Sequence, residues 1–164
     1  MSDPGLKKLL SRLSSSLAED KLVQTVTHNL RKNLSVDRVV LYYFYRQWSG
    51  RVTFESLSSA KFSIFGSTGP DECFNDEYAA LYERGRVSAI ADIEQAAIAA
   101  CHRDFLRTIK VRANLVAPIL TPRGLWGLLA AHHCQSPLRW SENDLKVMQE
   151  GAKILANAAS IRDD

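Results

Sequence analysis

The N-terminal part of the chain carries apolar residues at the spacing of amphipathic helices. They form two sets, one from Leu6 to Leu17 and one from Leu22 to Leu34, with Ala18-Glu19-Asp20 between them. The pattern predicts one helix or two, ending near Asn33. A β-branched and aromatic segment, residues 36–45, then predicts a strand. After a turn at Trp48-Ser49-Gly50, residues 51–58 predict its hairpin partner.

The rest of the chain alternates between predicted helices and predicted strands. Glycines and a proline within residues 60–74 indicate a structured loop. The predicted elements after it are a helix from Asn75 or Asp76 to Arg84 ended by Gly85, a short strand at 86–93, a helix within 96–109, strands at 111–120 and 125–133 around a turn at 121–124, and a long helix capped by Ser141 and Asp144 that runs to about Ile161.

This order of elements predicts an α+β fold with a central antiparallel sheet of about five to six strands and helices on its faces. The length of 164 residues suits a single domain over residues 1–164. Composition adds little, since 46% hydrophobic and 24% charged residues are ordinary for a globular protein. The net charge of +3, without a block of like charges, argues against a nucleic-acid surface.

The expected compartment follows from two patterns. The polar start of the chain does not resemble a secretory signal, and no apolar run approaches the roughly 18 residues of a membrane span. We therefore expect a cytoplasmic location without membrane contact, where thiols stay reduced. Three cysteines cannot all pair with one another, so at least one free thiol needs an explanation.

Cys101 is followed directly by His102 on a predicted helix. A basic neighbour or a helix lowers the pKa of a thiol and favours the nucleophilic thiolate. Taken alone, however, the dipeptide is more typical of a buried structural cysteine beside a surface histidine.

The surroundings of this pair change its interpretation. Residues 101–106, 111–120 and 125–134 resemble, in order and spacing, the chromophore-binding GAF domains of cyanobacteriochromes, which are relatives of phytochromes. Residues 37–42 and 82–93 are similar to the same family, and the resemblance extends over about residues 17–163. It implies a GAF fold and a bilin-binding photoreceptor domain, which is not an enzyme.

The resemblance also assigns roles to the residues around the pair. Cys101 would form the permanent thioether to a linear tetrapyrrole, phycocyanobilin or phycoviolobilin. His102 would lie against the pyrrole rings and help to manage their protons. His132 occupies the position that faces the fourth ring in phytochromes. Because side chains alternate along a strand, His132 and His133 should point to opposite faces, so at most one should enter the pocket.

A second motif is Asp71-Glu72-Cys73-Phe74, which resembles the Asp-X-Cys-Phe signature of one cyanobacteriochrome subgroup. In that subgroup the aspartate contacts pyrrole nitrogens, and the cysteine adds reversibly to the methine bridge between the two central rings. The addition interrupts conjugation and shifts absorption to the blue. The resemblance therefore implies a blue/green photoswitch with Cys73 as the second thiol. Without it, Cys73 would be an exposed loop thiol.

The remaining candidates would hold the periphery of a bilin. Its two propionates need cations, and Arg84, Arg86 and Arg112 could pair with them in bidentate fashion. Aromatic side chains that could stack on the rings are Phe74, Tyr78, Phe65 and Trp126. Cys134 has no role that the resemblance transfers, and we interpret it as structural.

Two alternatives stay open on the sequence. The first is a non-photoactive GAF domain that binds a small ligand such as a cyclic nucleotide, or that senses redox state. The second is a metal site built from the cysteines and histidines, which the spacing disfavours because a Cys-X-X-Cys pattern is missing. The sequence also lacks a nucleophile elbow, a phosphate-binding glycine loop and an HExxH motif.

The expected partners lie outside the chain. The predicted terminal helices, apolar on one stripe, could form a homodimer and link the sensor to an effector domain. We therefore expect this domain to be a module of a larger signalling protein, for example a kinase, a cyclase or a chemotaxis receptor.

Overall fold

The computed structural model describes residues 3–68 and 76–163. Its helices and strands are α1 (Pro4–Glu19), α2 (Lys21–Leu34), β1 (Arg38–Arg46), β2 (Ser49–Leu57), the short 3-10 helix η1 (Ala60–Phe62), α3 (Asp76–Glu83), β3 (Ser88–Ile90), α4 (Ala100–Thr108), β4 (Ala113–Thr121), β5 (Gly124–His133), α5 (Glu142–Leu155) and α6 (Ala159–Arg162). The sheet is antiparallel, with strand order β2-β1-β5-β4-β3. The predicted α+β fold with a five- to six-stranded sheet is therefore confirmed.

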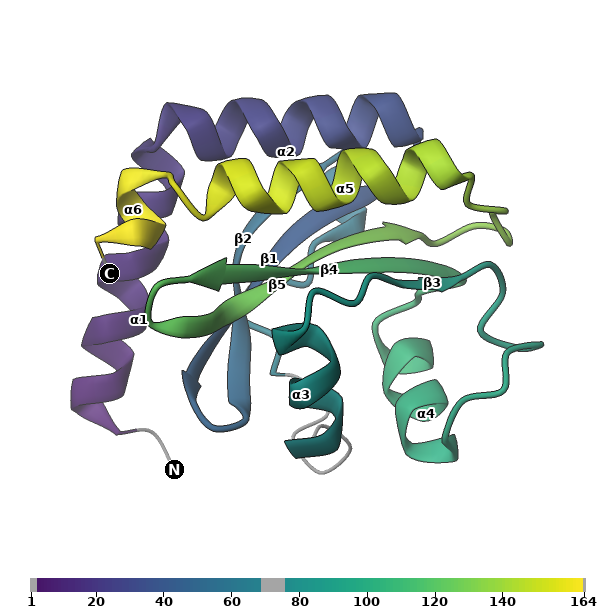
Figure 1. The fold of residues 1–164 in the computed structure, drawn as a ribbon, viewed down its shortest axis with the longest axis horizontal. Helices are drawn as coiled ribbons and strands as arrows, with labels where there is room; N and C mark the ends of the chain where they lie inside the picture. Colours follow the sequence, from purple (N-terminus) through teal and green to yellow (C-terminus); the bar gives the residue numbers. More distant parts are fainter. Residues whose placement is uncertain (1–2, 69–75, 164) are drawn as a thin grey trace.

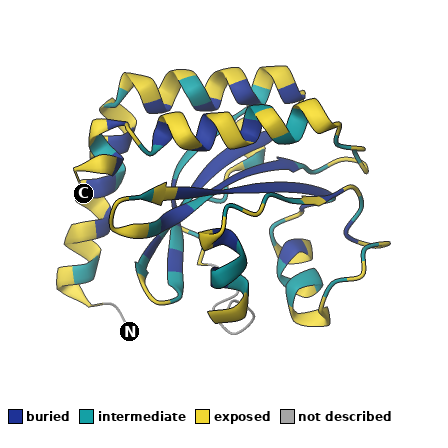
Figure 2. Ribbon diagram, viewed as in Figure 1, coloured by how far each residue is buried: buried dark blue, intermediate teal, exposed yellow. Residues whose placement is uncertain are grey.

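The sheet separates two groups of helices (Figure 1). Helices α2 and α5 run side by side over one face, and α3 and α4 lie over the other. Helices α2 and α5 cover the main hydrophobic core, whose members include Leu30, Leu41, Leu115, Leu129 and Met148. Burial of each such side chain stabilises the fold by about 1.5–3 kcal/mol. Figure 2 shows this core as buried residues along the inner sides of the helices and through the sheet. None of the described helices is both long enough and apolar enough to cross a membrane.

The N-terminal helical segment is two helices because Asp20 interrupts it. This residue has an extended backbone, and its Oδ1 accepts hydrogen bonds from the backbone N–H groups of Leu22 and Val23, at 3.0 and 3.4 Å. An N-cap of this kind satisfies donors that have no partner inside the helix. The sequence left one or two helices open, and the cap decides for two.

The C-terminal helix is shorter than predicted. It begins as expected with a capping box between Ser141 and Asp144, but α5 ends at Leu155 instead of continuing to about Ile161. The backbone is extended at Ala158, and a separate helix, α6, follows. The Oδ2 atom of Asp20 accepts hydrogen bonds from the backbone N–H and the hydroxyl of Ser160, at 3.1 and 2.7 Å. One carboxylate therefore accepts hydrogen bonds from the first turns of both α2 and α6.

Two glycines allow this architecture. Gly127 lies where β5 pairs with β1, and a Cβ atom there would approach the carbonyl oxygen of Tyr42 to 2.1 Å. Gly85 follows α3 with φ +92°, a backbone conformation that other residues rarely adopt. The predicted end of this helix at Gly85 is thereby confirmed.

Candidate functional site

A cavity of about 640 Å³ lies on the face of the sheet that the long helices leave uncovered. Its floor is formed by β1, β4 and β5, and its walls come from α3, β3, α4 and the segment 96–99. Most of the lining side chains are apolar. Small-molecule sites typically have volumes of 300–1,000 Å³ and few polar groups, and this cavity has both properties.

Strand alternation decides which side chains reach the cavity. On β1, Val39 and Leu41 pack into the main core, and Val40 faces the cavity. On β5, Leu129 packs into the core, and Ala130 faces the cavity. Because the side-chain period of a strand is two, the two polar residues in phase with Val40 and Ala130, Asn114 on β4 and His132 on β5, also face the cavity.

His132 lies in the floor of the cavity and is only 4% exposed. Its Nδ1 accepts a hydrogen bond from Nε of Arg38 at 2.9 Å. Burial, together with the positive charge of Arg38, lowers the pKa of His132 well below its ordinary value of 6.5. The ring is therefore neutral at neutral pH. His133 is not a lining residue, and its Nδ1 lies 2.8 Å from the carbonyl oxygen of Ser136, as alternation along β5 predicts.

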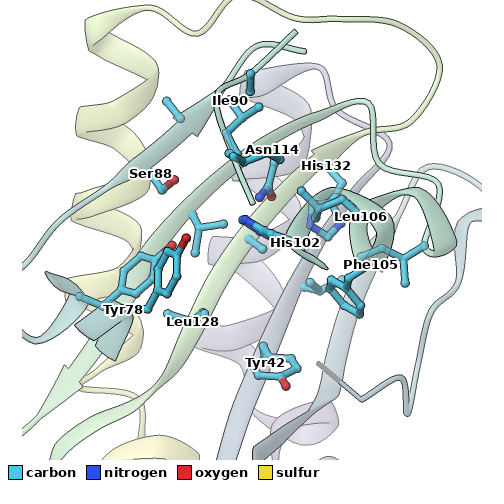
Figure 3. Close-up of a pocket in the computed structure, with 18 of the residues that line it drawn as sticks. Tyr42, Tyr78, Ser88, Ile90, His102, Phe105, Leu106, Asn114, Leu128 and His132 are labelled. Carbon is cyan, nitrogen blue, oxygen red and sulfur yellow. The ribbon is translucent and has the colours of Figure 1, made fainter. Parts of the chain in front are cut away.

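His102, near the start of α4, reaches the same cavity from the opposite wall (Figure 3). Burial lowers its pKa below 6.5, so this ring is also neutral at neutral pH. Tyr78 on α3 faces it edge-on, with 6.5 Å between the ring centroids and 71° between the ring planes. Tyr78 and His102, both singled out from the sequence, thus come together at the cavity.

Asn114 is a site residue that the sequence reasoning missed. Its side chain is 4% exposed and lines the cavity, and its Oδ1 is buried without a hydrogen-bond partner among the described residues. Leaving such an acceptor unpaired costs about 1–3 kcal/mol. The available signal was a polar residue in the otherwise apolar strand 113–119, in register with His132.

Cys101 lies at the edge of the cavity on the first turn of α4. Ala99, two residues before it, and His102, directly after it, line the cavity, whereas Cys101 itself is exposed. It is disulfide-bonded in the structure, so its sulfur is not a thiol in this state. Cys134 is a free, half-buried cysteine whose backbone N–H donates to Oδ2 of Asp37 at 2.6 Å.

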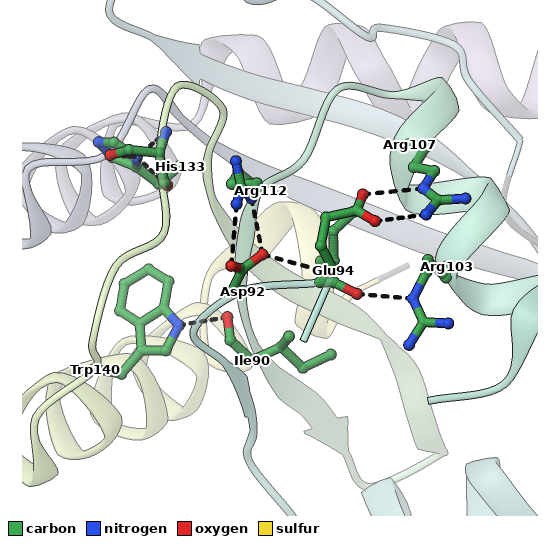
Figure 4. Close-up of polar contacts among 10 residues, drawn as sticks. Ile90, Asp92, Glu94, Arg103, Arg107, Arg112, His133 and Trp140 are labelled. Atoms are coloured by element: carbon green, nitrogen blue, oxygen red, sulfur yellow. Dashed lines mark hydrogen bonds and ion pairs between the residues drawn. The ribbon is translucent and has the colours of Figure 1, made fainter. Parts of the chain in front are cut away.

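The three candidate arginines have different surroundings. Arg86 lines the cavity, and Arg84 is exposed just beyond α3 and is not a lining residue. Arg112 makes a bidentate pair with Asp92, at 2.8 and 3.0 Å (Figure 4). The hydrogen bond to Arg112 lowers the pKa of Asp92. Of the three, Arg86 is therefore the arginine that lines the cavity.

The remaining sequence candidates lie elsewhere. Trp126 is buried against Tyr43 in the main core, on the other side of the sheet, and Phe65 is 57% exposed. Asp71, Cys73 and Phe74 lie outside the described residues. Among the residues that are described, no three histidine, cysteine or acidic side chains are grouped so that they could hold a metal ion.

Comparison with known proteins identifies relatives of this architecture. A sequence model of the GAF domain matches residues 19–159. The chain is 47% identical over 163 residues to an uncharacterized protein of Picosynechococcus sp., of which it covers 100%. It is 36% identical over 140 residues to a putative methyl-accepting chemotaxis protein of Synechocystis sp., covering 85% of this chain but only 14% of that protein.

Solved structures resemble the chain equally well. A cyanobacteriochrome receptor PixJ, solved in dark and illuminated states, has a TM-score of 0.75 and 32% identity, over 86% of this chain and 96% of that one. The blue-light-absorbing form of the PixJ GAF domain of Thermosynechococcus elongatus has a TM-score of 0.70 and 33% identity, over 81% and 84%. A phycocyanobilin-bound GAF domain of a cyanobacterial phytochrome has a TM-score of 0.72 and 26% identity, over 94% and 93%.

Proposed function

The chain belongs to the GAF domain family, and from this membership and its cavity we propose that it is a bilin-binding photosensory domain. The observation that carries the proposal is the position of Cys101-His102. His102 enters an apolar cavity of about 640 Å³, and the sulfur-bearing neighbour lies at its edge. A ligand held in the cavity would have one end within reach of a cysteine that does not occupy the cavity itself.

The cavity chemistry suits a linear tetrapyrrole, a long conjugated ligand with pyrrole nitrogens along one edge. Apolar strand residues offer a flat floor for its rings. Asn114 supplies an unpaired acceptor for an N–H group, and the neutral rings of His102 and His132 offer further nitrogens for hydrogen bonds to a ligand. Arg86, which lines the cavity, could pair with one propionate of the ligand. Arg84, just outside the cavity, could pair with the other.

Attachment would proceed through the thiolate of Cys101. The sulfur adds to one carbon of a conjugated double bond at the end of the bilin, and a proton is delivered to the other carbon of that bond. One S–C bond forms, one C=C π bond is lost, and no oxidant or reductant takes part. Because the sulfur is disulfide-bonded in the structure, reduction must come first. Phycocyanobilin is the expected ligand, with isomerisation to phycoviolobilin as a further step.

The colour switch is assigned to Cys73, which lies outside the described residues. Its assignment depends on the resemblance of residues 71–74 to the Asp-X-Cys-Phe signature. A second, reversible thioether from Cys73 to the central methine bridge would give a blue-absorbing dark state. Light would isomerise the double bond next to the fourth ring, release Cys73 and produce a green-absorbing form. Asp71 would contact the pyrrole nitrogens, and Phe74 and Tyr78 would pack against the rings.

Signalling would use the opposite face of the sheet. Helices α2 and α5 cover that face, and α1 and α6 contact each other at its edge. These helices could join a second copy of the domain and an effector. The chain covers only 14% of the putative chemotaxis protein, which supports the use of such a domain as a module of a larger protein.

Coexpression with a phycocyanobilin-producing pathway tests the proposal. The purified protein should be coloured, show a zinc-induced fluorescent band in a denaturing gel, and change its absorption spectrum after blue illumination. A colourless product without a fluorescent band would refute the function. Stabilisation of that product by a cyclic nucleotide would instead support the small-ligand alternative.

A further inference from the structure

Three polar residues form a row across the sheet, and two of them, His132 and Asn114, line the cavity. Arg38 on β1 pairs in register with His132 on β5, and His132 pairs in register with Asn114 on β4. All three are at most 4% exposed. The side chains of directly paired residues lie on the same face of a sheet, close enough to interact. The row therefore begins with a permanent cation and ends with the unpaired acceptor of Asn114.

Arg38 makes three hydrogen bonds to three different elements. Its Nε donates to Nδ1 of His132 at 2.9 Å, its Nη1 donates to the carbonyl oxygen of Phe62 at 2.9 Å, and its Nη2 donates to the carbonyl oxygen of Ile109. Phe62 ends η1, and Ile109 caps the C-terminus of α4. A guanidinium anchored at three points has a fixed orientation, and it fixes the position of whatever it binds.

The direction of the Arg38–His132 hydrogen bond determines the tautomer of His132. A guanidinium has only donors and stays protonated in proteins, so Nδ1 must be the acceptor. The neutral imidazole then carries its proton on Nε2. Among the described residues, Arg38 is the hydrogen-bond partner of this side chain, and the ring lines the cavity. The N–H group on Nε2 is thus left for a ligand.

The carboxyl groups near Arg38 and His132 have hydrogen-bond partners of their own. Three acidic groups of the described residues interact electrostatically with Arg38: the thiol of Cys134 and the carboxyl groups of Glu55 and Asp37. The two oxygens of Asp37 accept from the backbone N–H of Cys134 and from Nε2 of Gln135, and those of Glu55 accept from Ser63 and Ile64.

Other titratable groups lie around His132 and Cys134. Burial raises the pKa of the Cys134 thiol, and the positive charge of nearby Lys110 acts against this larger effect and lowers it. His102 enters the cavity from α4. No carboxylate among the described residues is hydrogen-bonded to His132, so none competes with Arg38 for the ring.

We propose that Arg38 is a positioning residue that holds His132 in its Nε2–H form, so that the ring presents a permanent hydrogen-bond donor to an acceptor atom of the bound ligand. Asn114 supplies the complementary acceptor beside it. The ligand in this inference is the bilin of the proposed function. The tautomer itself, however, is a property of the protein without any ligand and can be tested there.

The test is nitrogen NMR of the apoprotein labelled with ¹⁵N-histidine, with the signals of His132 assigned by its loss in His132→Gln. We expect the Nε2–H tautomer at all pH values from about 5 to about 8, without protonation of Nδ1. A ring that carries its proton on Nδ1, or that titrates in this range, would overturn the inference. This result does not depend on bilin uptake, so it fails or succeeds separately from the proposed function.

Two variants test the role of Arg38. In Arg38→Gln, whose neutral amide can donate or accept, we expect His132 to titrate or to exchange between tautomers, whereas Arg38→Lys, which keeps a charged donor, should retain the Nε2–H form. The matched control is Arg103→Gln, which removes an arginine that also donates to backbone carbonyl oxygens, those of Ile93 and Ala96, without contacting His132. An unchanged His132 signal in folded Arg38→Gln, or loss of the Nε2–H form in folded Arg38→Lys, would refute the positioning role.

In holoprotein, the spectral change caused by Arg38→Gln should be small when His132 is already glutamine, because residues that act through one another have non-additive effects. A change of full size in that background would show that Arg38 acts on the bilin by another route.

Discussion

Asn114 and His132 lie directly opposite each other on β4 and β5, and each is 4% exposed on the floor of the same cavity. Asn114 provides an acceptor, Oδ1, that has no hydrogen-bond partner among the described residues. His132 provides a ring whose Nδ1 accepts a hydrogen bond from Arg38. A polar pair of this kind is expensive in an empty apolar cavity and useful in one that receives a ligand with complementary groups.

Replacing Asn114 by leucine should separate stability from binding. The variant removes an unpaired buried acceptor, so the free energy of unfolding of the apoprotein should stay the same or rise by about 1 kcal/mol. Bilin uptake should fall, because the acceptor for the ligand is lost. Urea denaturation of the apoprotein and the absorbance of coexpressed holoprotein measure the two effects.

The matched control is Thr27→Val on α2, on the opposite face of the sheet. Thr27 is buried, and its hydroxyl donates to the carbonyl oxygen of Val23 at 2.7 Å. This variant should lower the unfolding free energy by about 1 kcal/mol and leave bilin uptake unchanged. Normal uptake by Asn114→Leu together with a large loss of stability would show that Asn114 serves the fold and not the ligand.

The stability of the apoprotein should depend on pH through His132. Burial and the charge of Arg38 lower its folded-state pKa well below 6.5, so the unfolded chain binds a proton that the folded protein rejects. This contribution is fully present above about pH 6.5 and is lost as the pH falls toward the folded-state pKa, at up to about 1.4 kcal/mol per pH unit. His102, whose pKa burial also lowers, acts in the same direction.

Denaturant unfolding at a series of pH values between about 5 and about 7 measures this slope. His132→Gln should reduce it, since glutamine can accept the hydrogen bond of Arg38 but does not titrate. His28→Gln, at an exposed position on α2 outside the cavity, is the control for replacing a histidine by glutamine. Equal slopes for the wild type and His132→Gln would contradict the assignment.

The colour of the dark state should depend on Cys73. In Cys73→Ala the second thioether cannot form, so conjugation is uninterrupted and the dark state should absorb at a longer wavelength. Absorption spectra of the variant and of Cys134→Ala, which removes the free and half-buried thiol, provide the comparison. A dark spectrum of Cys73→Ala identical to that of the wild type would end the two-cysteine mechanism.

Bilin attachment should require a reductant. Cys101 is disulfide-bonded and exposed, so a small dithiol can reach it and release the thiol. Oxidised apoprotein mixed with phycocyanobilin should give no zinc-fluorescent band, and reduced apoprotein should give a strong one. Equal bands under both conditions would mean that the disulfide does not control attachment.

Much of the fold could be predicted from periodicity. The change from helical spacing to β-branched alternation located every strand, and the capping residues Ser141 and Asp144 located the start of α5. The end of that helix was predicted wrongly because its apolar stripe continues through Ala158 and Ile161. After the break, the chain is hydrogen-bonded to a distant carboxylate, Asp20, and local sequence does not show such contacts.

The site was only partly accessible from the sequence. The resemblance to a known family pointed to Cys101, His102 and His132, and alternation predicted that His132 and His133 lie on opposite faces. Trp126 could not be separated from the core by composition, since its face of the sheet depends on register. Asn114 and Arg38 emerged only from the structure, because their roles depend on pairing between strands that lie far apart in sequence.

The central claim is a covalent bond between a tetrapyrrole and Cys101, and peptide mapping of reduced, bilin-loaded protein tests it most directly. After tryptic digestion, mass spectrometry should find the mass of one bilin on the peptide that contains Cys101, and none on the peptide that contains Cys134. An unmodified Cys101 peptide from a protein whose pigment is lost on denaturation would contradict the account.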